Sequence, residues 1–308
     1  MPFRGSCIFP TGEERIRFGT DAGVKTNMKF TMYNGFGDMV VRKGIEQTAA
    51  YARKLGFSSV EASADLYFGS KNPFNCVSDA QTARVVLEEN QLSVSCYTAY
   101  TDLWGDPTCE VSICKHLEIA SALGSPYFHH TLAPRLTSAN DPEYRTVIKK
   151  LVEVASRIAD YADTLGVTCI YEDQGFYVNG VEGFGGFWRE MKQRCRNIGV
   201  CGDMGNILFV NETPKAFFEN YIEDICHVHV KDYLWKKAKQ SPGRYWEEAT
   251  EDSWLRDTMI GHGVVDIESC LKILKDAGYS GSFALELSHP EPYEEGVAQA
   301  MEYLKRFW

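Results

Sequence analysis

Residues 224–233, D-I-C-H-V-H-V-K-D-Y, place three chemically active side chains in a short apolar run. His227, His229 and Lys231 occupy alternate positions, so in a β-strand two imidazoles and one ammonium would point to the same face. Burying such a trio for packing alone is costly, because desolvated polar groups need partners. The stretch indicates either a functional strand or a set of satisfied core histidines, and the rest of the chain has to decide between the two.

Side chains that can ligate a metal stand at the ends of four successive apolar runs in the C-terminal half of the chain. These residues are Glu172, Asp203, His229 and Glu286. One acidic residue at the end of a strand is ordinary as a helix cap or a solvated rim residue, but four such ends in succession are hard to explain in that way. Three carboxylates and one neutral imidazole suit a divalent cation of intermediate softness. We expect one such ion, with Mn2+ preferred and Mg2+, Co2+ or Zn2+ as alternatives.

A scaffold has to bring these strand ends together, and the order of the predicted elements supplies one. Apolar runs typical of strands start near residues 28, 59, 92, 126, 168, 199, 225 and 281. A predicted helix follows each of them, over residues 40–56, 79–90, 109–123, 141–165, 186–195, 213–220, 266–277 and 291–307. Strict alternation implies parallel strands with right-handed crossovers, and eight such units close into a (β/α)8 TIM barrel.

In this α/β fold the chemistry lies at the C-terminal ends of the strands, where the four candidate ligands are predicted. A doubly wound open sheet is the alternative, but no glycine fingerprint follows the first strand. No linker or low-complexity segment divides the chain. We therefore expect a single barrel domain over residues 28–308, preceded by an N-terminal arm or cap over residues 1–27.

Composition narrows the class of protein. The 308 residues carry a net charge of −10, which argues against nucleic acid and anionic membranes as partners. No apolar run approaches the roughly 18 residues of a membrane span, and the N-terminal residues lack the apolar core of a secretory signal. The ten cysteines form no C-x-x-C pair, and several fall inside apolar runs as buried thiols do. These features predict a cytoplasmic location.

Five sequence blocks carry a family resemblance. Y-E-D-Q-G, C-G-D-M-G-N, H-V-H-V-K-D and A-L-E-L resemble, in order, the metal-binding blocks of the xylose-isomerase-like TIM barrels, and G-H-G-V-V-D at 261–266 resembles a further block of that group. The group includes sugar phosphate isomerases and epimerases, ketose 3-epimerases and inosose dehydratases. The resemblance covers roughly residues 28–308. It implies that Glu172, Asp203, His229 and Glu286 are the metal ligands, and that Glu172 and Glu286 also act as the acid/base pair.

The chemistry implied by these residues is proton transfer beside a carbonyl. A divalent ion that binds a ketone oxygen and the neighbouring hydroxyl lowers the barrier to removing the proton between them, through an enediolate. Two carboxylates can remove and return that proton. Lys231 could stabilise the enediolate oxygen; as an alternative, it is a rim lysine paired with Asp232. We expect a metal-dependent isomerase or epimerase whose small-molecule substrate is a sugar, a sugar phosphate or a cyclitol.

Three positions depart from the ketose 3-epimerases. Where that subfamily has a histidine, a glutamate and an arginine that contact the substrate, this chain has Asn206, Val178 and Trp235. A free-ketose 3-epimerase is therefore disfavoured. The long segment at 233–260 is similar to one in inosose dehydratases, and related barrels that cleave C-glycosides share the framework. A lyase, in which a β-leaving group departs after the same proton removal, is the runner-up.

Further candidates for substrate contacts lie in loops around the predicted mouth. We expect Asn206, Trp104, His262 and one of the pair His129–His130, with His130 as the candidate, to contact the substrate. The glycine- and aromatic-rich segment 173–189 has the composition of a mobile lid. The aromatic residues of 233–260 fit either a substrate role or a subunit contact. Barrels of this group often pair, so a homo-oligomer is compatible with the sequence by analogy.

Two other functional classes fit the sequence less well. Apurinic endonucleases use this barrel with three zinc ions, but they need many more histidine and aspartate ligands than seven histidines and the four strand ends provide. A sugar sensor or assembly subunit without catalytic activity would have to leave a complete set of metal ligands idle.

Overall fold

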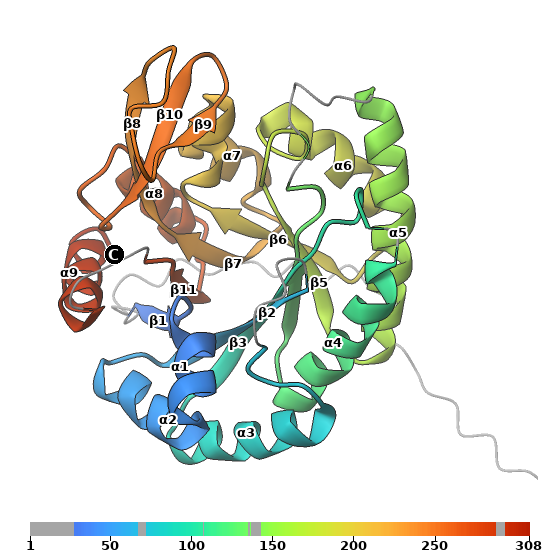
Figure 1. Ribbon diagram of the computed structural model, residues 1–308, viewed down its shortest axis with the longest axis vertical. Coiled ribbons are helices and arrows are strands. Elements are labelled where there is room, and N and C mark those ends of the chain that lie inside the picture. Colours follow the sequence, from blue (N-terminus) through green and yellow to red (C-terminus); the bar gives the residue numbers. More distant parts are fainter. Residues whose placement is uncertain (1–27, 67–71, 107, 135, 137–142, 288–292) are drawn as a thin grey trace, which may run out of the picture.

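The eight predicted strands form a closed parallel barrel (Figure 1). The computed structural model describes residues 28–66, 72–106, 108–134, 136, 143–287 and 293–308. The barrel strands are β1 (Lys29–Met32), β2 (Ser59–Asp65), β3 (Ser93–Tyr100), β4 (Tyr127–His130), β5 (Thr168–Glu172), β6 (Ile198–Asp203), β7 (Ile225–Val230) and β11 (Ser282–Leu285). Their order around the barrel is β1-β11-β7-β6-β5-β4-β3-β2, and β1 pairs with β2 to close it. The expected (β/α)8 architecture is confirmed.

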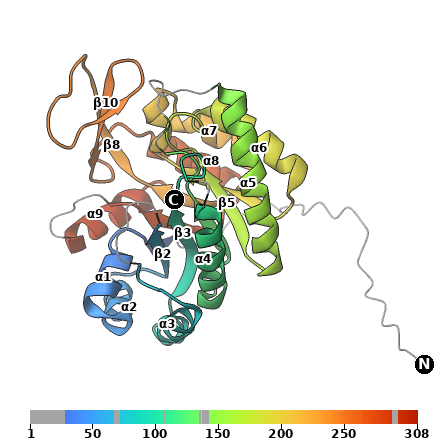
Figure 2. The ribbon, with the colours of Figure 1, turned by 45° about the vertical axis from the view of Figure 1, so that its right-hand side comes forward.

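Helices surround the barrel, as Figures 1 and 2 show. They are α1 (Phe36–Lys43), α2 (Ile45–Lys54), α3 (Val77–Glu89), α4 (Cys109–Leu123), α5 (Tyr144–Thr164), α6 (Val181–Arg194), α7 (Pro214–Tyr221), α8 (Ile267–Asp276) and α9 (Tyr293–Lys305). The single helix expected over 40–56 is two helices, because Gly44 adopts a φ of 83° between them. The predicted N-terminal arm at residues 1–27 lies outside the described residues.

The prediction of a mobile lid over residues 173–189 is wrong for the second half of this segment, which is part of a packed helix. Helix α6 begins at Val181, and its side chains Phe184, Phe187 and Trp188 are buried against the barrel. Three glycines of this helix allow close packing rather than movement. A Cβ added at Gly185 would lie 2.6 Å from the Tyr221 hydroxyl, and the neighbouring glycines are similarly crowded. Tertiary packing here overrides the low helix propensity of glycine.

The segment expected at 233–260 folds into a small antiparallel sheet, which we call the insertion sheet. It consists of β8 (Asp232–Lys237), β9 (Glu247–Ala249) and β10 (Ser253–Thr258), in the order β8-β10-β9. In both Figure 1 and Figure 2 this orange sheet projects from the ring of helices. It is tied to the 3-10 helix η2 (Asn206–Val210), because the Thr250 amide donates to the Phe209 carbonyl at 2.9 Å and Asn211 Nδ2 donates to the Thr250 carbonyl at 2.7 Å.

Asp232 anchors the base of the insertion sheet. Its two carboxylate oxygens accept hydrogen bonds from the backbone amides of Tyr233, Gly261, Gly263 and Val265, at 2.9, 3.0, 2.8 and 3.1 Å. The turn that supplies these donors needs glycine, because Gly261 has a φ of 90° and a Cβ at Gly263 would overlap the Asp232 side chain. The G-H-G-V-V-D block therefore has a structural role in holding the chain against Asp232.

Buried apolar side chains fill the space between the barrel and the helices. The cysteines of the described residues are free thiols, and most of them are buried, as expected. Within the described ranges, no helix has the length and hydrophobicity needed to cross a membrane.

We expect Asp232→Ala to lower the free energy of unfolding by about 2–4 kcal/mol, because four backbone donors would lose a buried acceptor. Urea unfolding followed by circular dichroism measures this. Asp266→Ala is the matched control, since it removes only the α8 cap bond from the Ser269 amide and should cost about 1 kcal/mol. Equal losses in the two variants would contradict the anchoring role of Asp232.

Candidate active site

The four predicted metal ligands converge at the C-terminal mouth of the barrel. His229 on β7 is at their centre: its Nδ1 lies 2.7 Å from Glu172 Oε1, 3.9 Å from Asp203 Oδ2 and 3.9 Å from Glu286 Oε2. Strand register produces this arrangement, because Asp203 and Ala284 flank His229 in the neighbouring strands. The side chains of Glu172, Asp203 and His229 are almost fully buried, whereas that of Glu286 is 22% exposed.

Lys231 is part of this cluster and not a rim residue. Its Nζ lies 2.8 Å from Glu286 Oε2 and 3.2 Å from Asp203 Oδ2, and it donates to Asn206 Oδ1 at 3.0 Å. The alternative pairing with Asp232 is wrong, because that carboxylate is bound to backbone amides. Burial opposes the charged form of Lys231, but Asp203 and Glu286 raise the pKa of its ammonium well above the ordinary value.

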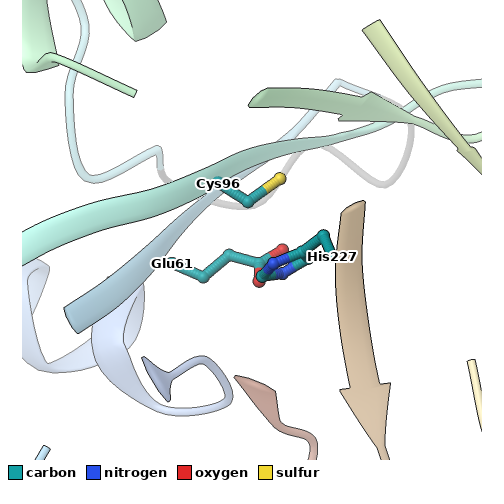
Figure 3. A group of neighbouring side chains, drawn as sticks. All are labelled: Glu61, Cys96 and His227. Carbon is teal, nitrogen blue, oxygen red and sulfur yellow. The ribbon is translucent and has the colours of Figure 1, made fainter. Parts of the chain in front are cut away.

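Glu61 on β2 is a buried acid that the sequence analysis did not identify as part of the site. Its Oε2 lies 2.7 Å from His227 Nε2, its Oε1 lies 3.2 Å from His229 Nε2, and Thr98 Oγ1 donates to Oε1 at 2.6 Å. Figure 3 shows Glu61 and His227 meeting in the barrel interior near Cys96. A carboxylate on Nε2 holds the imidazole so that Nδ1 is free to face the mouth. The available signal was an acid inside the small, apolar stretch S-S-V-E-A-S-A.

His129 and His130 lie on opposite faces of β4. His129 points into the barrel, where its Nε2 is 3.8 Å from Glu172 Oε2 and its Nδ1 is 3.3 Å from Thr98 Oγ1. His130 points outward and packs edge-on against the Tyr171 ring, with centroids 5.3 Å apart. Burial lowers the pKa of His129 to about 4 and that of His130 to about 3. The structure thus brings His129 to the cluster and leaves the predicted substrate contact His130 away from it.

Of the other predicted substrate contacts, one lies at the cluster and two lie away from it. Asn206 lies at the cluster, where it accepts from Lys231. Trp104 is partly buried and stacks under Lys150, whose Nζ is 4.4 Å from the ring centroid. His262 is an exposed turn residue. Neither Trp104 nor His262 lines the cavity described below.

The donor atoms of the cluster fit a divalent cation. Asp203 Oδ1 accepts from the amides of Gly205 and Asn206 at 2.7 and 2.6 Å, whereas its buried Oδ2 has no hydrogen-bond partner among the described residues. Burial raises the pKa of Asp203 to about 7, although Lys231 acts in the opposite direction. Ligand atoms of Asp203, His229 and Glu286 lie within 4.8 Å of one another. An ion among them would give this oxygen a direct ligand and add to the positive charge that Lys231 already places 3.2 Å away.

A cavity of 660 Å3 opens beside the cluster, and the insertion sheet forms part of its wall. The residues lining it are Tyr100, Thr101, Thr131, Pro134, Gln174, Gly175, Phe176, Asn206, Phe209, Lys231, Tyr233, Glu247, Glu248, Asp257 and Glu286. Four of them belong to segment 233–260, for which the sequence allowed either a substrate role or a subunit contact. Its contribution comes from Tyr233 and three carboxylates, whereas Trp235 and Tyr245 are exposed to solvent.

Comparison with known proteins agrees with this geometry. The family described as Xylose isomerase-like TIM barrel matches residues 49–307. An inosose dehydratase of Clostridium beijerinckii is 29% identical over 33% of this chain and 36% of its own length. An inosose isomerase of Halalkalibacterium halodurans is 26% identical over 61% of this chain and 62% of its own length. The matched segments thus span from about a third to less than two thirds of these relatives.

Solved structures share the fold at low sequence identity. D-psicose 3-epimerase with D-tagatose from Clostridium cellulolyticum has a TM-score of 0.68 and 14% identity, covering 91% of this chain and 99% of that chain. A xylose isomerase-like TIM barrel protein from Mycobacterium smegmatis in complex with magnesium has a TM-score of 0.66 and 16% identity, covering 91% and 96%.

We expect Glu61→Gln to weaken Mn2+ binding about 10- to 100-fold, because the amide no longer holds His229 Nε2 as a carboxylate does. Isothermal titration of metal-free protein with MnCl2 measures the affinity. Thr98→Val is the matched control, since it removes one hydrogen bond to Glu61 and leaves both Glu61–imidazole contacts in place. Unchanged affinity in folded Glu61→Gln protein would contradict this positioning role.

Proposed function

The chain belongs to the xylose isomerase-like TIM barrel family, and we propose that it is a divalent-metal-dependent isomerase or epimerase of a sugar or cyclitol ketone. One observation carries the proposal: Glu172 and Glu286 both approach His229 Nδ1 at the barrel mouth, beside a cavity that reaches solvent. Two carboxylates around one reaction centre are what reversible proton transfer requires. We propose Mn2+ as the ion and the cytoplasm as the location.

Glu172, Asp203, His229 and Glu286 are the residues that would hold the ion. When bound, such an ion would polarise the substrate carbonyl and so acidify the adjacent C–H bond. Of Glu172 and Glu286, only Glu286 lines the cavity, so we assign it the first proton transfer from the substrate carbon. Glu172 lies deeper, where burial is outweighed by His229, which lowers its pKa to about 2. We assign Glu172 the delivery of a second proton to the opposite face of that carbon, a role for which it must first take up a proton, while Glu286 keeps the proton that it removed.

Lys231 is proposed to stabilise the negative charge that develops on the enediolate oxygen. Its ammonium lies at the cavity wall and is held by Asp203, Glu286 and Asn206. A donor whose position is set before reaction costs no reorganisation when charge develops.

A lyase is the second candidate, in which a hydroxyl group leaves from the carbon next to the carbanion. Support comes from two positions that in ketose 3-epimerases contact the substrate. Val178 is buried and Trp235 is largely exposed, and neither lines the cavity. Tyr233, Glu247, Glu248 and Asp257 of the insertion sheet form part of the cavity wall instead, and the C. beijerinckii relative is an inosose dehydratase.

Proton exchange in deuterated water tests the proposal. Mn2+-loaded protein is offered ketoses, ketose phosphates and keto-inositols, and products are followed by NMR. Deuterium beside the carbonyl together with an epimer or isomer supports the leading function, whereas exchange followed by loss of water supports the lyase. Protein that holds metal but exchanges no proton in any compound would refute the shared chemistry.

We expect Glu286→Gln to lower the exchange rate by at least about 10²-fold, because the first base is lost. The same exchange assay measures the rate. His262→Ala is the control, since this exposed turn residue does not line the cavity. An equally slow His262→Ala protein would show that the assay reports folding and not acid/base chemistry.

Lys231→Met should lower kcat by about 10²- to 10³-fold. Affinity for Mn2+ should be retained or increased, because an ammonium that competes for Asp203 and Glu286 is removed. Steady-state kinetics together with metal titration separate these effects. A variant that loses metal and activity in parallel would instead give Lys231 a structural role in the cluster.

A further inference from the structure

Resting on the proposed function, we propose that this site takes uncharged polyhydroxy ketones and rejects their phosphate esters. We assign the discrimination to the insertion sheet, through Glu247, Glu248 and Asp257. The inference answers a question that the sequence left open, namely whether the substrate carries a phosphate.

The charges that line the cavity are unbalanced. Glu247, Glu248, Asp257 and Glu286 contribute carboxylates, whereas Lys231 is the one lysine or arginine among the described residues of the wall. That ammonium is already shared by Asp203, Glu286 and the Asn206 amide oxygen. A phosphate dianion would therefore meet several carboxylates and no uncommitted cation, whereas a phosphate site normally presents arginine, lysine or a set of backbone amides.

Strand pairing in the insertion sheet puts two of its basic residues on the face opposite to Tyr233 and Asp257. Lys237 shares the face of Tyr233 but stands at the last position of β8, and Glu248 lies on the opposite face. Tyr233 faces Asp257 across β8 and β10, and Glu247 pairs with Leu255 on the same side. Lys236 and Arg256 occupy the alternate positions of these strands and so lie on the opposite face. Of the five lysines and arginines in 232–258 (residues 236, 237, 239, 244 and 256), none lines the cavity.

The remaining polar groups of the wall suit hydroxyl groups. Asn206 is 4% exposed, and its Nδ2 has no hydrogen-bond partner among the described residues. Its orientation follows from Lys231, which can only donate and therefore needs the amide oxygen. Gln174 Oε1 is a buried acceptor that also has no partner within the described ranges. A free donor, a free acceptor and acceptor carboxylates together match a polyol, whose hydroxyls both donate and accept.

Three aromatic rings complete the wall. Phe176 meets Phe209 edge-to-face at 6.2 Å, and Phe209 meets Tyr233 edge-to-face at 5.7 Å. These rings come from the loop after β5, from η2 and from β8, and the Thr250–Phe209 backbone bond holds the insertion sheet against η2. The backbone that carries the carboxylates is therefore held in place beside the cavity.

A matched pair of ligands tests the inference by binding alone. D-Fructose and D-fructose 6-phosphate share the ketone and differ in one phosphate, and their binding to Mg2+-loaded protein is measured by ligand-observed NMR at low ionic strength. We expect the phosphate ester to bind at least about tenfold more weakly. In the triple variant Glu247→Gln, Glu248→Gln, Asp257→Asn, this difference should shrink about tenfold, while binding of fructose changes little. Added salt should also reduce it.

Asp252→Asn is the matched control, because Asp252 belongs to the same segment, is exposed and does not line the cavity. Equal or tighter binding of the phosphate ester, an unchanged difference in the triple variant, or no binding of either compound up to its solubility limit would overturn the inference. Proton exchange is not measured here. If fructose binds more tightly than its phosphate ester but no compound exchanges a proton, only the proposed chemistry is refuted. If protons exchange but the phosphate ester binds more tightly, only the proposed charge selection is refuted.

Discussion

The position of one imidazole determines how the rest of this site is arranged. His229 has a carboxylate at each ring nitrogen: Glu61 lies 3.2 Å from Nε2 and Glu172 lies 2.7 Å from Nδ1. Both contacts are buried, where an unpaired polar group would be costly, so the ring has little freedom to turn. Tyr33 stacks on it at a centroid distance of 4.8 Å and closes the remaining side. Asp203 and Glu286 can share Nδ1 as a neighbour only because the ring is held in this way.

Strand β7 and the two residues after it supply three different functions within four positions. His229 is the centre of the cluster, Lys231 reaches the cavity wall, and Asp232 anchors the insertion sheet that forms another part of that wall. Alternation along an extended chain separates these tasks, because neighbouring side chains point to opposite sides. The distance between the reaction centre and the charges of the insertion sheet is consequently set by a very short piece of backbone.

The barrel, its strand set and the convergence of four strand ends could be predicted from sequence, because strand–helix alternation and the position of polar residues within apolar runs are local properties. The role of Glu61 could not be predicted in this way. Alternation along β2 places Glu61 inside the barrel, but it does not indicate which imidazole Glu61 contacts across the interior. The sequence predicted His130 as the substrate contact in place of His129, because alternation along a strand does not indicate which of two neighbouring side chains points into the barrel. Glycines in α6 were taken as signs of movement, although their neighbours in space require their small size.

Lys231 and a divalent ion would draw on the same two carboxylates, and this constrains how the site can work. The ammonium lies 2.8 Å from Glu286 Oε2 and 3.2 Å from Asp203 Oδ2, and both oxygens also face His229 Nδ1. Two cations can share a carboxylate through its different lone pairs, so Lys231 need not leave when metal enters. It would, however, weaken the hold of these carboxylates on the ion. A site built in this way balances metal affinity against a cation placed for the substrate. Glu61 then matters because it holds His229, one of the two proposed ligands, with Glu172, that Lys231 does not contact.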